Sequence, residues 1–406
     1  MAVRILDVEF TQAGGAIEGI EGCDRALVLV RHGGVPLGQV TVPVRDGGIA
    51  AGAIRDAFQP GLVARWAALD QVGRHLPVPL ERLPVRRLTA TVAICTRERP
   101  DDLARALTAA AALPHRSGGV LVIDNCPATP ATREVAARFP GVRYVVEPRR
   151  GLDNARNRAL AEAATDIVAF IDDDAVADAG WLDALMEPFG DPDVGCVTGL
   201  TLPLELENEA QEEFETWAGF SQRGFERREF RSPPIHPLAT GPIGAGANMA
   251  VRRSLLEAIG PFDPALDAGT PTQSGGDHEY FSRILRAGWT IVYEPRALNR
   301  HRHRRTRDEM LKAVRGYGTG AYAAWTRSLM VEGDRDAPRR AWGWLVHDQI
   351  PGLLHAILQR RGARPLDVAL AELRGCVAGP FAYLASRRQA RAEEARSSPG
   401  VAGTGA

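Results

Sequence analysis

A short hydrophobic run that ends in three consecutive carboxylates constrains this chain most. Residues 167–171 read Ile-Val-Ala-Phe-Ile, and Asp172, Asp173 and Asp174 follow directly. A continuous apolar run of this length is typical of a strand buried on both faces of a parallel sheet. In open α/β sheets, ligands bind at the carboxyl ends of the strands, where this triplet would lie. Adjacent carboxylates repel one another, so the triplet indicates either a divalent cation, Mn²⁺ or Mg²⁺, or an acidic helix-capping loop.

The segments around this run alternate between strand and helix patterns. Further buried strands are predicted at 88–96, 119–124, 142–146, 194–203 and 291–294. Helices are predicted between them at 103–113, 130–139, 151–164 and 181–185. Short connections between alternating elements favour an α/β fold with a doubly wound, parallel sheet. The stretch after the first strand, Thr96–Pro100, contains no glycine, which excludes a dinucleotide fingerprint and a Walker A loop there.

The segments on either side of this alternating region are of a different kind. Residues 1–85 predict a small β-rich N-terminal domain that ends in a helix and a proline-rich connector. Its two strands, helix and connector are expected at 26–31, 35–44, 54–71 and 76–84. Residues 306–390 predict C-terminal helices, and residues 391–406 predict a disordered tail.

Composition places the chain among ordinary globular proteins. It has 406 residues, of which 45% are hydrophobic and 24% charged, and its formal net charge is −1. This balance gives no reason to expect nucleic-acid binding. The five cysteines are scattered and lack C-x-x-C spacing, which favours a reducing cytosol over disulfides or a zinc site. No signal-peptide pattern and no run of eighteen uncharged apolar residues occurs, so we expect a cytoplasmic protein without a membrane-spanning helix.

Two later stretches carry polar groups suited to a binding site. Residues 241–251 are rich in glycine and include Asn248, whose amide is both donor and acceptor. A later helix carries Asp277 and Glu279 in its first turn, where Asp277 could also serve only as a helix cap.

Two other stretches suggest surfaces for larger partners. Residues 205–237 are long, polar and aromatic, which predicts a lid or a substrate-facing surface, with core packing as an equal alternative for Trp217. Seven basic residues form a local cluster that could hold a diphosphate or dock at the anionic inner face of a membrane. They are Arg296, Arg300, Arg302, Arg304, Arg305, Arg307 and Lys312. The helices after them could form a homodimer or lie at the membrane interface.

Because of the order of these elements, the chain resembles glycosyltransferase family 2, and in particular the bacterial members that build cell-surface glycans. The family has the GT-A fold, a Rossmann-like doubly wound sheet. The resemblance covers residues 88–305 and rests on short motifs in a fixed order. They are Thr96–Pro100, Asp124, Arg150–Asn157, the Asp172–Asp174 triplet, Gly246–Met249, Gly276–Glu279 and the pair His301 and His303.

The resemblance implies a site for a nucleoside-diphosphate sugar and a divalent metal, Mn²⁺ or Mg²⁺. Asp172 and Asp174 correspond to the D-x-D motif and would bind the metal, with the ribose as a second possible partner of Asp172. His301, in preference to His303, would be the third ligand, and a basic surface tail is the alternative for both. The donor pocket would be lined, with Asp124 at the nucleobase, by Thr96, Arg97, Asp124, Arg156, Asp172, Asp173 and Asn248.

The resemblance also implies a general base for the acceptor hydroxyl, namely Asp277. A carboxylate can do this at neutral pH when burial or nearby negative charge raises its pKa. The family commonly has Glu-Asp at this point, whereas Gly276 precedes Asp277 here, so Glu279 is the alternative base. For Arg156, the alternative to contact with the nucleotide is an exposed position on a helix.

These roles imply an inverting transfer of one sugar to a hydroxyl of a glycan or glycolipid in cell-surface polysaccharide or glycolipid synthesis. No Gln-x-x-Arg-Trp motif of processive synthases occurs. Two other classes stay open as alternatives. A sugar-phosphate nucleotidyltransferase would need a G-x-G-T-R loop and a downstream lysine, which we do not find. A non-catalytic carbohydrate-binding relative would have little reason to hold Asp172, Asp174 and Asp277 together.

Overall fold

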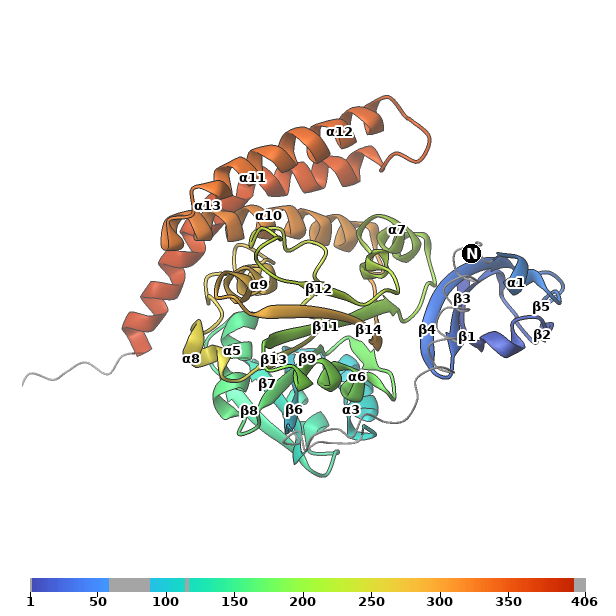
Figure 1. The fold of residues 1–406 in the computed structure, drawn as a ribbon, viewed down its shortest axis with the longest axis horizontal. Helices are drawn as coiled ribbons and strands as arrows, with labels where there is room; N and C mark the ends of the chain where they lie inside the picture. Colours follow the sequence, from blue (N-terminus) through green and yellow to red (C-terminus); the bar gives the residue numbers. More distant parts are fainter. Residues whose placement is uncertain (1, 58–87, 114–116, 398–406) are drawn as a thin grey trace, which may run out of the picture.

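The computed structural model describes residues 2–57, 88–113 and 117–397. They form an N-terminal β unit, a central α/β unit and a set of C-terminal helices (Figure 1). The predicted connector at 76–84 and most of the predicted helix at 54–71 lie outside the described residues.

The N-terminal unit is a small sheet with its own hydrophobic core. Its three strands lie in the order β1-β3-β4, with β1 (Ala2–Glu9) parallel to β3 (Cys23–His32) and β4 (Val35–Pro43) antiparallel to it. Two short strands, β2 (Ile17–Glu18) and β5 (Gly48–Ile49), pair separately, and α1 (Ala53–Ala57) ends the described part. Strands β3 and β4 match the predicted pair, whereas β1 has no counterpart among the predictions.

Among the described residues the central sheet has nine strands, eight of them in the order β10-β14-β11-β13-β9-β6-β7-β8, with β12 pairing β14. In chain order the parallel strands are β6 (Ala90–Thr96), β7 (Ser117–Asn125), β8 (Val142–Glu147), β9 (Ile167–Asp172), β11 (Val194–Pro203) and β14 (Thr290–His301). The antiparallel strands are β10 (Ala175–Ala177), β12 (Arg228–Phe230) and β13 (Asn248–Arg252). The predicted doubly wound, mostly parallel sheet is therefore confirmed.

Helices cover both faces of this sheet and bury its strands. The helices are α3 (Pro100–Ala111), α4 (Ala131–Ala136), α5 (Leu152–Glu162), α6 (Trp181–Met186), α7 (Glu209–Ala218), α8 (Leu255–Ala258) and α9 (Gly276–Arg286). In β9, Val168 and Phe170 belong to the hydrophobic core that includes α5 and α9. The alternate residues of β9 belong to the core that includes α3 and α6. This strand is therefore buried on both faces, as its continuous apolar sequence predicts.

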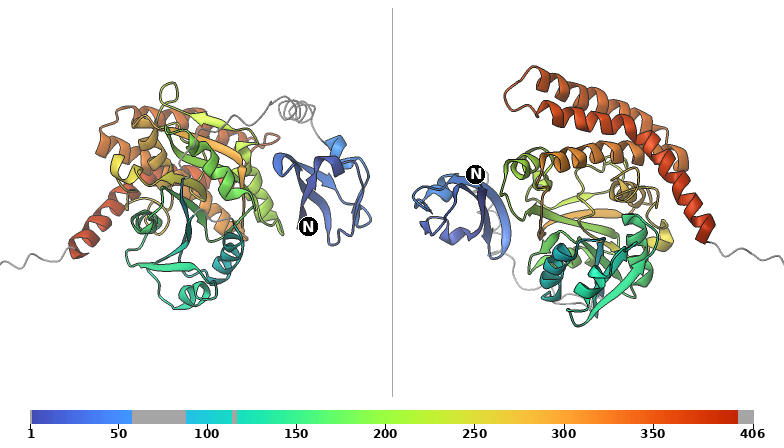
Figure 2. Two further views of the ribbon diagram at one scale, coloured as in Figure 1. Left: turned by 60° about the horizontal axis from the view of Figure 1, so that its bottom comes forward. Right: turned by 180° about the vertical axis from the view of Figure 1, so that it is seen from behind.

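The C-terminal helices pack on the central unit and on one another. They are α10 (Arg307–Glu332), α11 (Asp336–Trp344), α12 (Ile350–Ile357) and α13 (Leu366–Ser397), with a π-helical turn at Leu345–Gln349. Helix α10 lies along α9 and α7, while α12 and the first part of α13 project beyond the central unit (Figures 1 and 2). Gly318 and Gly375 allow α10 and α13 to approach closely, since a Cβ atom at either would collide with the other helix.

One expectation about the C-terminal part differs from the structure. Residues 391–397 continue α13 as a helix, whereas we predicted a disordered tail from residue 391; residues 398–406 lie outside the described part. By length and apolar composition alone, one helix within the described ranges, Leu366–Ala395, could cross a membrane. A core helix of a soluble protein passes the same test.

Candidate active site

The site is built at the carboxyl edge of the central sheet. Strands β6, β7 and β9 are parallel neighbours and end at Thr96, Asn125 and Asp172. In the strand register Thr96 lies opposite Asp124, and Cys95 lies opposite Asp172. Three motifs that are separated in the sequence therefore meet at one edge, which is where open α/β sheets bind ligands.

Asp172, Asp174 and His301 form a cluster with the spacing of a metal site. One ligand atom from each lies within 4.8 Å of the others. The antiparallel pairing of β10 with β14 sets Ala175 opposite His301, and His301 Nε2 lies 3.1 Å from Asp174 Oδ1. Nδ1 of His301 is buried without a hydrogen-bond partner in the part of the chain that the structure describes. Two carboxylates and an imidazole fit Mn²⁺, and Mg²⁺ less closely because it prefers oxygen ligands.

The pKa values of the two carboxylates in this cluster are shifted in opposite directions. Burial and the neighbouring charge of Asp174 raise the pKa of Asp172. Burial alone would also raise the pKa of Asp174, but His301, Arg304 and Arg99 hold it well below its usual range. Positive charge is thus needed to keep both groups ionised in one place, and a divalent cation would supply it.

His303 is held apart from the cluster by a different carboxylate. Its Nε2 lies 2.7 Å from Glu215 Oε2 of α7, and the ring is 2% exposed. Burial lowers the pKa of His303. The geometry therefore favours His301 over His303 as a metal ligand, and the alternative of a basic surface tail is wrong because both rings are buried.

The middle carboxylate, Asp173, is occupied by hydrogen bonds inside the protein. Thr96 Oγ1 donates to Asp173 Oδ2 (2.7 Å), and Arg99 donates to Asp173 Oδ1 (3.1 Å) and to Asp174 Oδ2 (3.0 Å). Burial and the charge of Asp174 raise the pKa of Asp173 to about 7. Asp173 and Thr96 thus hold the loop after β6 against the Asp172–Asp174 triplet. We had predicted that both would contact the donor, and in the structure they bond to each other instead. Arg99 lies within the Thr96–Pro100 motif, yet the sequence reasoning did not single it out.

The end of β7 presents a carboxylate with one unused oxygen. Asp124 is fully buried, and its Oδ2 accepts a hydrogen bond from the hydroxyl of Tyr144 (2.7 Å). Its Oδ1 has no partner among the described residues, and the same is true of the buried Nε of Arg97. Burial raises the pKa of Asp124. An acceptor (Asp124 Oδ1) and a donor (Arg97 Nε) without hydrogen-bond partners are suited to bind the polar edge of a nucleobase.

Arg156 is buried in an ion-pair network, so the alternative of an exposed helix arginine is wrong. Its Nη1 donates to Asp153 Oδ1 (2.8 Å) and to Asp267 Oδ2 (2.6 Å). Asp153 also explains the glycine that replaces the family's glutamate, because a Cβ atom at Gly276 would collide with Asp153 Oδ2. Arg156 packs beside Gly246 and contributes to the electrostatics of Asp277, but two carboxylates already occupy it.

Asp277 lies at the start of α9 with its carboxylate held by two backbone N–H groups. Its Oδ2 accepts from Gly246 N (2.7 Å) and its Oδ1 from His278 N (2.8 Å). The N-cap residue of α9 is Gly275, so the helix-cap alternative for Asp277 is wrong. Burial alone would raise the pKa of Asp277, but His278, Arg156 and the two N–H groups lower it. The carboxylate is ionised at neutral pH by these neighbours, and the raised pKa that we expected is not found.

Glu279 lines the same cavity as Asp277, but its carboxylate is held by arginines, which corrects its predicted role as an alternative base. Its side chain is buried, with Oε1 2.6 Å from Arg283 Nε and 2.7 Å from Arg327 Nη1. Its Oε2 accepts a second bond from Arg283 (2.9 Å). Two arginines therefore neutralise the carboxylate, and it joins α9 to α10.

Asn248 is also a structural residue, which corrects its predicted contact with the donor. The side chain is 1% exposed, and its Nδ2 donates to Leu200 O and Ala297 O, each at 2.9 Å. Its Oδ1 accepts from Trp181 Nε1 (2.8 Å). No amide proton is left for a ligand, so Asn248 ties β13 to β11, β14 and α6.

Truncation of this amide tests the structural role. We expect Asn248→Ala to lower the free energy of unfolding by about 3 kcal/mol, because it removes three buried hydrogen bonds. Urea denaturation followed by circular dichroism measures this change. If the variant kept its stability but bound the nucleotide more weakly, Asn248 would be a donor-binding residue after all.

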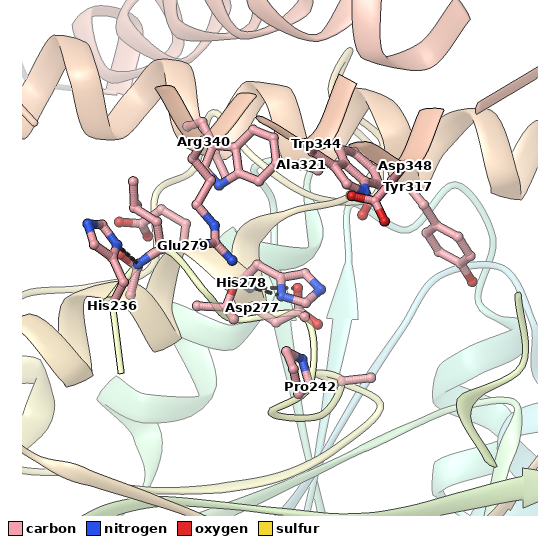
Figure 3. A pocket seen from close by; sticks show the side chains of 18 of the residues that line it. His236, Pro242, Asp277, His278, Glu279, Tyr317, Ala321, Arg340, Trp344 and Asp348 are labelled. Atoms are coloured by element: carbon pink, nitrogen blue, oxygen red, sulfur yellow. Dashed lines mark hydrogen bonds between the residues drawn. The ribbon is translucent and has the colours of Figure 1, made fainter. Parts of the chain in front are cut away.

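A cavity of about 1080 Å³ opens beside Asp277 (Figure 3), and it adjoins the metal-ligand cluster, since the ring of its wall residue Phe220 lies 5.5 Å from the ring of His301. Asp277 and His278 line it from α9, and Arg340 and Trp344 reach toward them from α11. Tyr317 lines it from α10. The segment predicted as a lid or substrate-facing surface contributes Phe220, Arg223, Arg228 and His236 to the wall. The C-terminal helices are thus part of the site, which no sequence motif indicated.

The predicted basic cluster is not a free positive patch. Its arginines are spread over the surface and pair with carboxylates, most of which are distant in the sequence. The pairs are Arg296 with Glu294 and Glu187, Arg300 with Asp7, Arg302 with Asp102, Arg304 with Asp174, Arg305 with Glu205 and Arg307 with Glu213 and Asp367. A cluster neutralised in this way gives little support to diphosphate or lipid binding.

The mostly parallel sheet and the cluster at its carboxyl edge are the arrangement that a family 2 glycosyltransferase with the GT-A fold would require. Comparison with known proteins identifies the family. The sequence model described as "Glycosyl transferase family 2" matches residues 91–260. The uncharacterised glycosyltransferase Rv0539 of Mycobacterium tuberculosis is 33% identical over 172 residues, which are 42% of this chain and 69% of that protein. The chain therefore belongs to glycosyltransferase family 2.

Other relatives carry more specific names. The pre-mycofactocin glycosyltransferase of Mycobacterium tuberculosis is 30% identical over 236 residues, covering 57% of this chain and 46% of that protein. The chain thus spans about half the length of this relative. The succinoglycan biosynthesis protein ExoM of Rhizobium meliloti is 28% identical over 229 residues, covering 53% and 67%. A solved mannosyltransferase, PcManGT from Pyrobaculum calidifontis with GDP-Man and Mn²⁺, has 19% identity and a TM-score of 0.45, covering 83% and 84%.

Proposed function

We propose that this glycosyltransferase moves one sugar, with inversion, from a nucleoside-diphosphate sugar to an acceptor hydroxyl, and that it depends on Mn²⁺ or Mg²⁺. The observation that carries the proposal is the cluster of Asp172, Asp174 and His301 at the carboxyl edge of the sheet. Asp277 lies at the adjoining cavity with a carboxylate that its neighbours keep ionised.

The donor would bind along the sheet edge. A divalent metal held by Asp172, Asp174 and His301 would neutralise the negative charge that develops on the leaving diphosphate. The unused Oδ1 of Asp124 is suited to accept a hydrogen bond from an N–H of the nucleobase. Arg97 supplies an unpaired donor in the same region.

The acceptor would bind in the cavity, with its hydroxyl facing Asp277. The ionised carboxylate would take the hydroxyl proton as the oxygen attacks the sugar. In this single-step displacement one bond forms to the anomeric carbon while the bond to the diphosphate breaks, and the proton passes to Asp277. No covalent sugar–enzyme intermediate is required.

The biological setting is part of the proposal. The name of ExoM refers to succinoglycan biosynthesis, which supports a role in cell-surface polysaccharide or glycolipid synthesis. We propose a cytoplasmic protein with peripheral contact at the inner face of the membrane, or a homodimer. Both uses fit the exposed apolar side chains of the C-terminal helices, including Trp342, Leu358, Val377 and Phe381. Flotation with anionic vesicles and sedimentation velocity distinguish the two.

A donor screen tests the proposed function. We expect one nucleotide class among UDP-, GDP- and dTDP-sugars to raise the melting temperature in the presence of Mn²⁺, and to be slowly hydrolysed. Ligand at about 100 times its dissociation constant adds roughly 2.7 kcal/mol of stability, which a thermal-shift assay detects readily. Stabilisation without any hydrolysis or transfer would favour a non-catalytic binding relative. A folded protein that responds to no nucleotide would refute the donor site.

A further inference from the structure

We propose that the acceptor carries an acidic group, a phosphate or a carboxylate, which binds to Arg223 and Arg228 while its hydroxyl faces Asp277. This inference rests on the proposed function, because it takes the cavity beside Asp277 as the acceptor site. It adds a chemical class for the acceptor, which none of the residues considered so far defines.

Arg223 is fixed close to Asp277 by the glycine-rich loop. It ends the 3₁₀ turn Phe220–Arg223, and its Nη2 donates to Gly244 O (2.9 Å). Two residues further on, Gly246 N donates to Asp277 Oδ2. One short loop thus holds both the arginine and the carboxylate, and both line the same cavity.

Neither arginine has a carboxylate partner in the part of the chain that the structure describes. The Nε atoms of Arg223 and Arg228 are buried without a hydrogen-bond partner. Arg223 otherwise contacts backbone carbonyls and the ring of Phe220, and Arg228 lies over the ring of Tyr293 at 5.4 Å. By contrast, the buried Arg156 and Arg283 each have carboxylate partners.

The Arg223 guanidinium is partly buried, and among the described residues the nearby Asp277 favours its charge without an ion pair or hydrogen bond to it, so a bound anion would complete its contacts. Burial lowers the pKa of Arg223, which means that burial opposes its charged form more than its neighbours favour it. A phosphate or carboxylate would add negative charge in direct contact and accept forked hydrogen bonds from the guanidinium. The remaining N–H groups of Arg223 and Arg228 are the natural donors for such a group.

The position of the pair assigns the acidic group to the acceptor and not to the donor. Both arginines line the cavity that contains Asp277, whereas Asp124, Asp172 and Asp174 do not line it. Trp325 and Trp344 line the same cavity from α10 and α11, with ring centroids 5.6 Å apart. The cavity volume of about 1080 Å³ leaves room for an acceptor larger than one sugar.

The test compares three small probes in ligand-observed NMR titrations without nucleotide: glucose 6-phosphate, glucuronate and glucose. We expect one or both acids to bind roughly 10- to 100-fold more tightly than glucose, as for charge-assisted hydrogen bonds. Arg223→Gln combined with Arg228→Gln should abolish this preference, while Arg223→Lys should retain part of it. Arg339→Gln is the matched control, because Arg339 lines the same cavity but pairs with Asp336 (2.9 Å).

The outcomes separate this inference from the proposed function. A preference for glucose 6-phosphate alone would identify a phosphate, and a preference for glucuronate alone would identify a carboxylate. Equal or undetectable binding of all three probes, or a preference that survives in the folded double variant, would overturn the inference. Weakened nucleotide binding in the double variant, with unchanged probe binding, would move the arginines to the donor site. The probe titrations do not depend on whether a donor is found; only the comparison of nucleotide binding requires one.

Discussion

Replacing Asp277 by asparagine is expected to lower the rate of sugar transfer by roughly 10²- to 10⁴-fold, the usual contribution of a general base. The amide keeps the size of the side chain and can still accept from Gly246 N, but it cannot take the proton of the acceptor hydroxyl. Donor binding should stay unchanged, because Asp277 lies in the cavity and outside the metal-ligand cluster. Steady-state kinetics together with a thermal shift by the donor measure both quantities.

The control for this variant is Asp336→Asn. It makes the same change of carboxylate to amide in the same cavity, where Asp336 pairs with Arg339 at the surface. Its rate should stay within about threefold of the wild type, as expected for an exposed ion pair worth less than about 1 kcal/mol. If Asp277→Asn also stayed within this range, Asp277 would not be the base.

The pKa of Asp277 gives a pH dependence with a definite sign. Because its neighbours lower the pKa below the usual value of about 4, the base is ionised throughout the range above that pH. Protonation of Asp277 therefore lowers the transfer rate only when the pH falls to its lowered pKa or below. An acidic limb centred near pH 6 or 7 must therefore come from another group.

The strand pattern of the catalytic unit could be predicted because it is a local property of the sequence. Residues 167–171 are apolar without interruption, and only a strand covered on both faces accommodates such a run. The meeting of Asp124 and Asp172 follows from the same pattern, since parallel strands end at one edge. The cluster of Asp172, Asp174 and His301 also depends on the register in which β10 pairs with β14. The order of the motifs suggested that His301 belongs to the cluster, but it did not give this geometry.

Side-chain direction accounts for two of the corrections. Asp277 and Glu279 are two residues apart on a helix, and successive positions turn by about 100°, so their side chains point to nearly opposite faces. The carboxylate of Asp277 accepts from Gly246 N and His278 N, whereas that of Glu279 contacts Arg283 and Arg327, although both residues line the cavity. Asn248 differs, because its direction depends on how β13 pairs with β9 and β11, and that pairing is not encoded in the glycine-rich loop.

Contacts between residues far apart in the sequence explain the other features that were not predicted. Arg300 pairs with Asp7, which is 293 positions away, and Arg302 pairs with Asp102, which is 200 positions away. A local run of arginines therefore looked like a free basic patch until distant carboxylates were placed beside it. The same holds for the cavity wall formed by α10 and α11. These helices carry no motif, and they reach the site because α10 packs on α7 and α9 while α11 packs on α10.

Replacing Asp174 by alanine is expected to abolish Mn²⁺ binding and to lower the transfer rate by about 10³-fold or more. Charge stabilisation by a bound metal is worth several kcal/mol in a transition state, and each 1.36 kcal/mol is a factor of ten. The fold should survive, because the arginines that pair with Asp174, Arg99 and Arg304, are 43% and 36% exposed and can be solvated. Mn²⁺ binding measured by electron paramagnetic resonance is a readout independent of activity.

A pair of histidine variants makes this experiment specific to the proposed ligand set. His301 and His303 are two residues apart and both buried, but His301 lies beside Asp174 whereas His303 pairs with Glu215. We therefore expect His301→Gln to weaken Mn²⁺ binding strongly and His303→Gln to leave it nearly unchanged. The reverse order would reassign the third ligand to His303. Wild-type transfer that is unaffected by EDTA would remove the metal from the proposal while leaving Asp277 and the cavity as they stand.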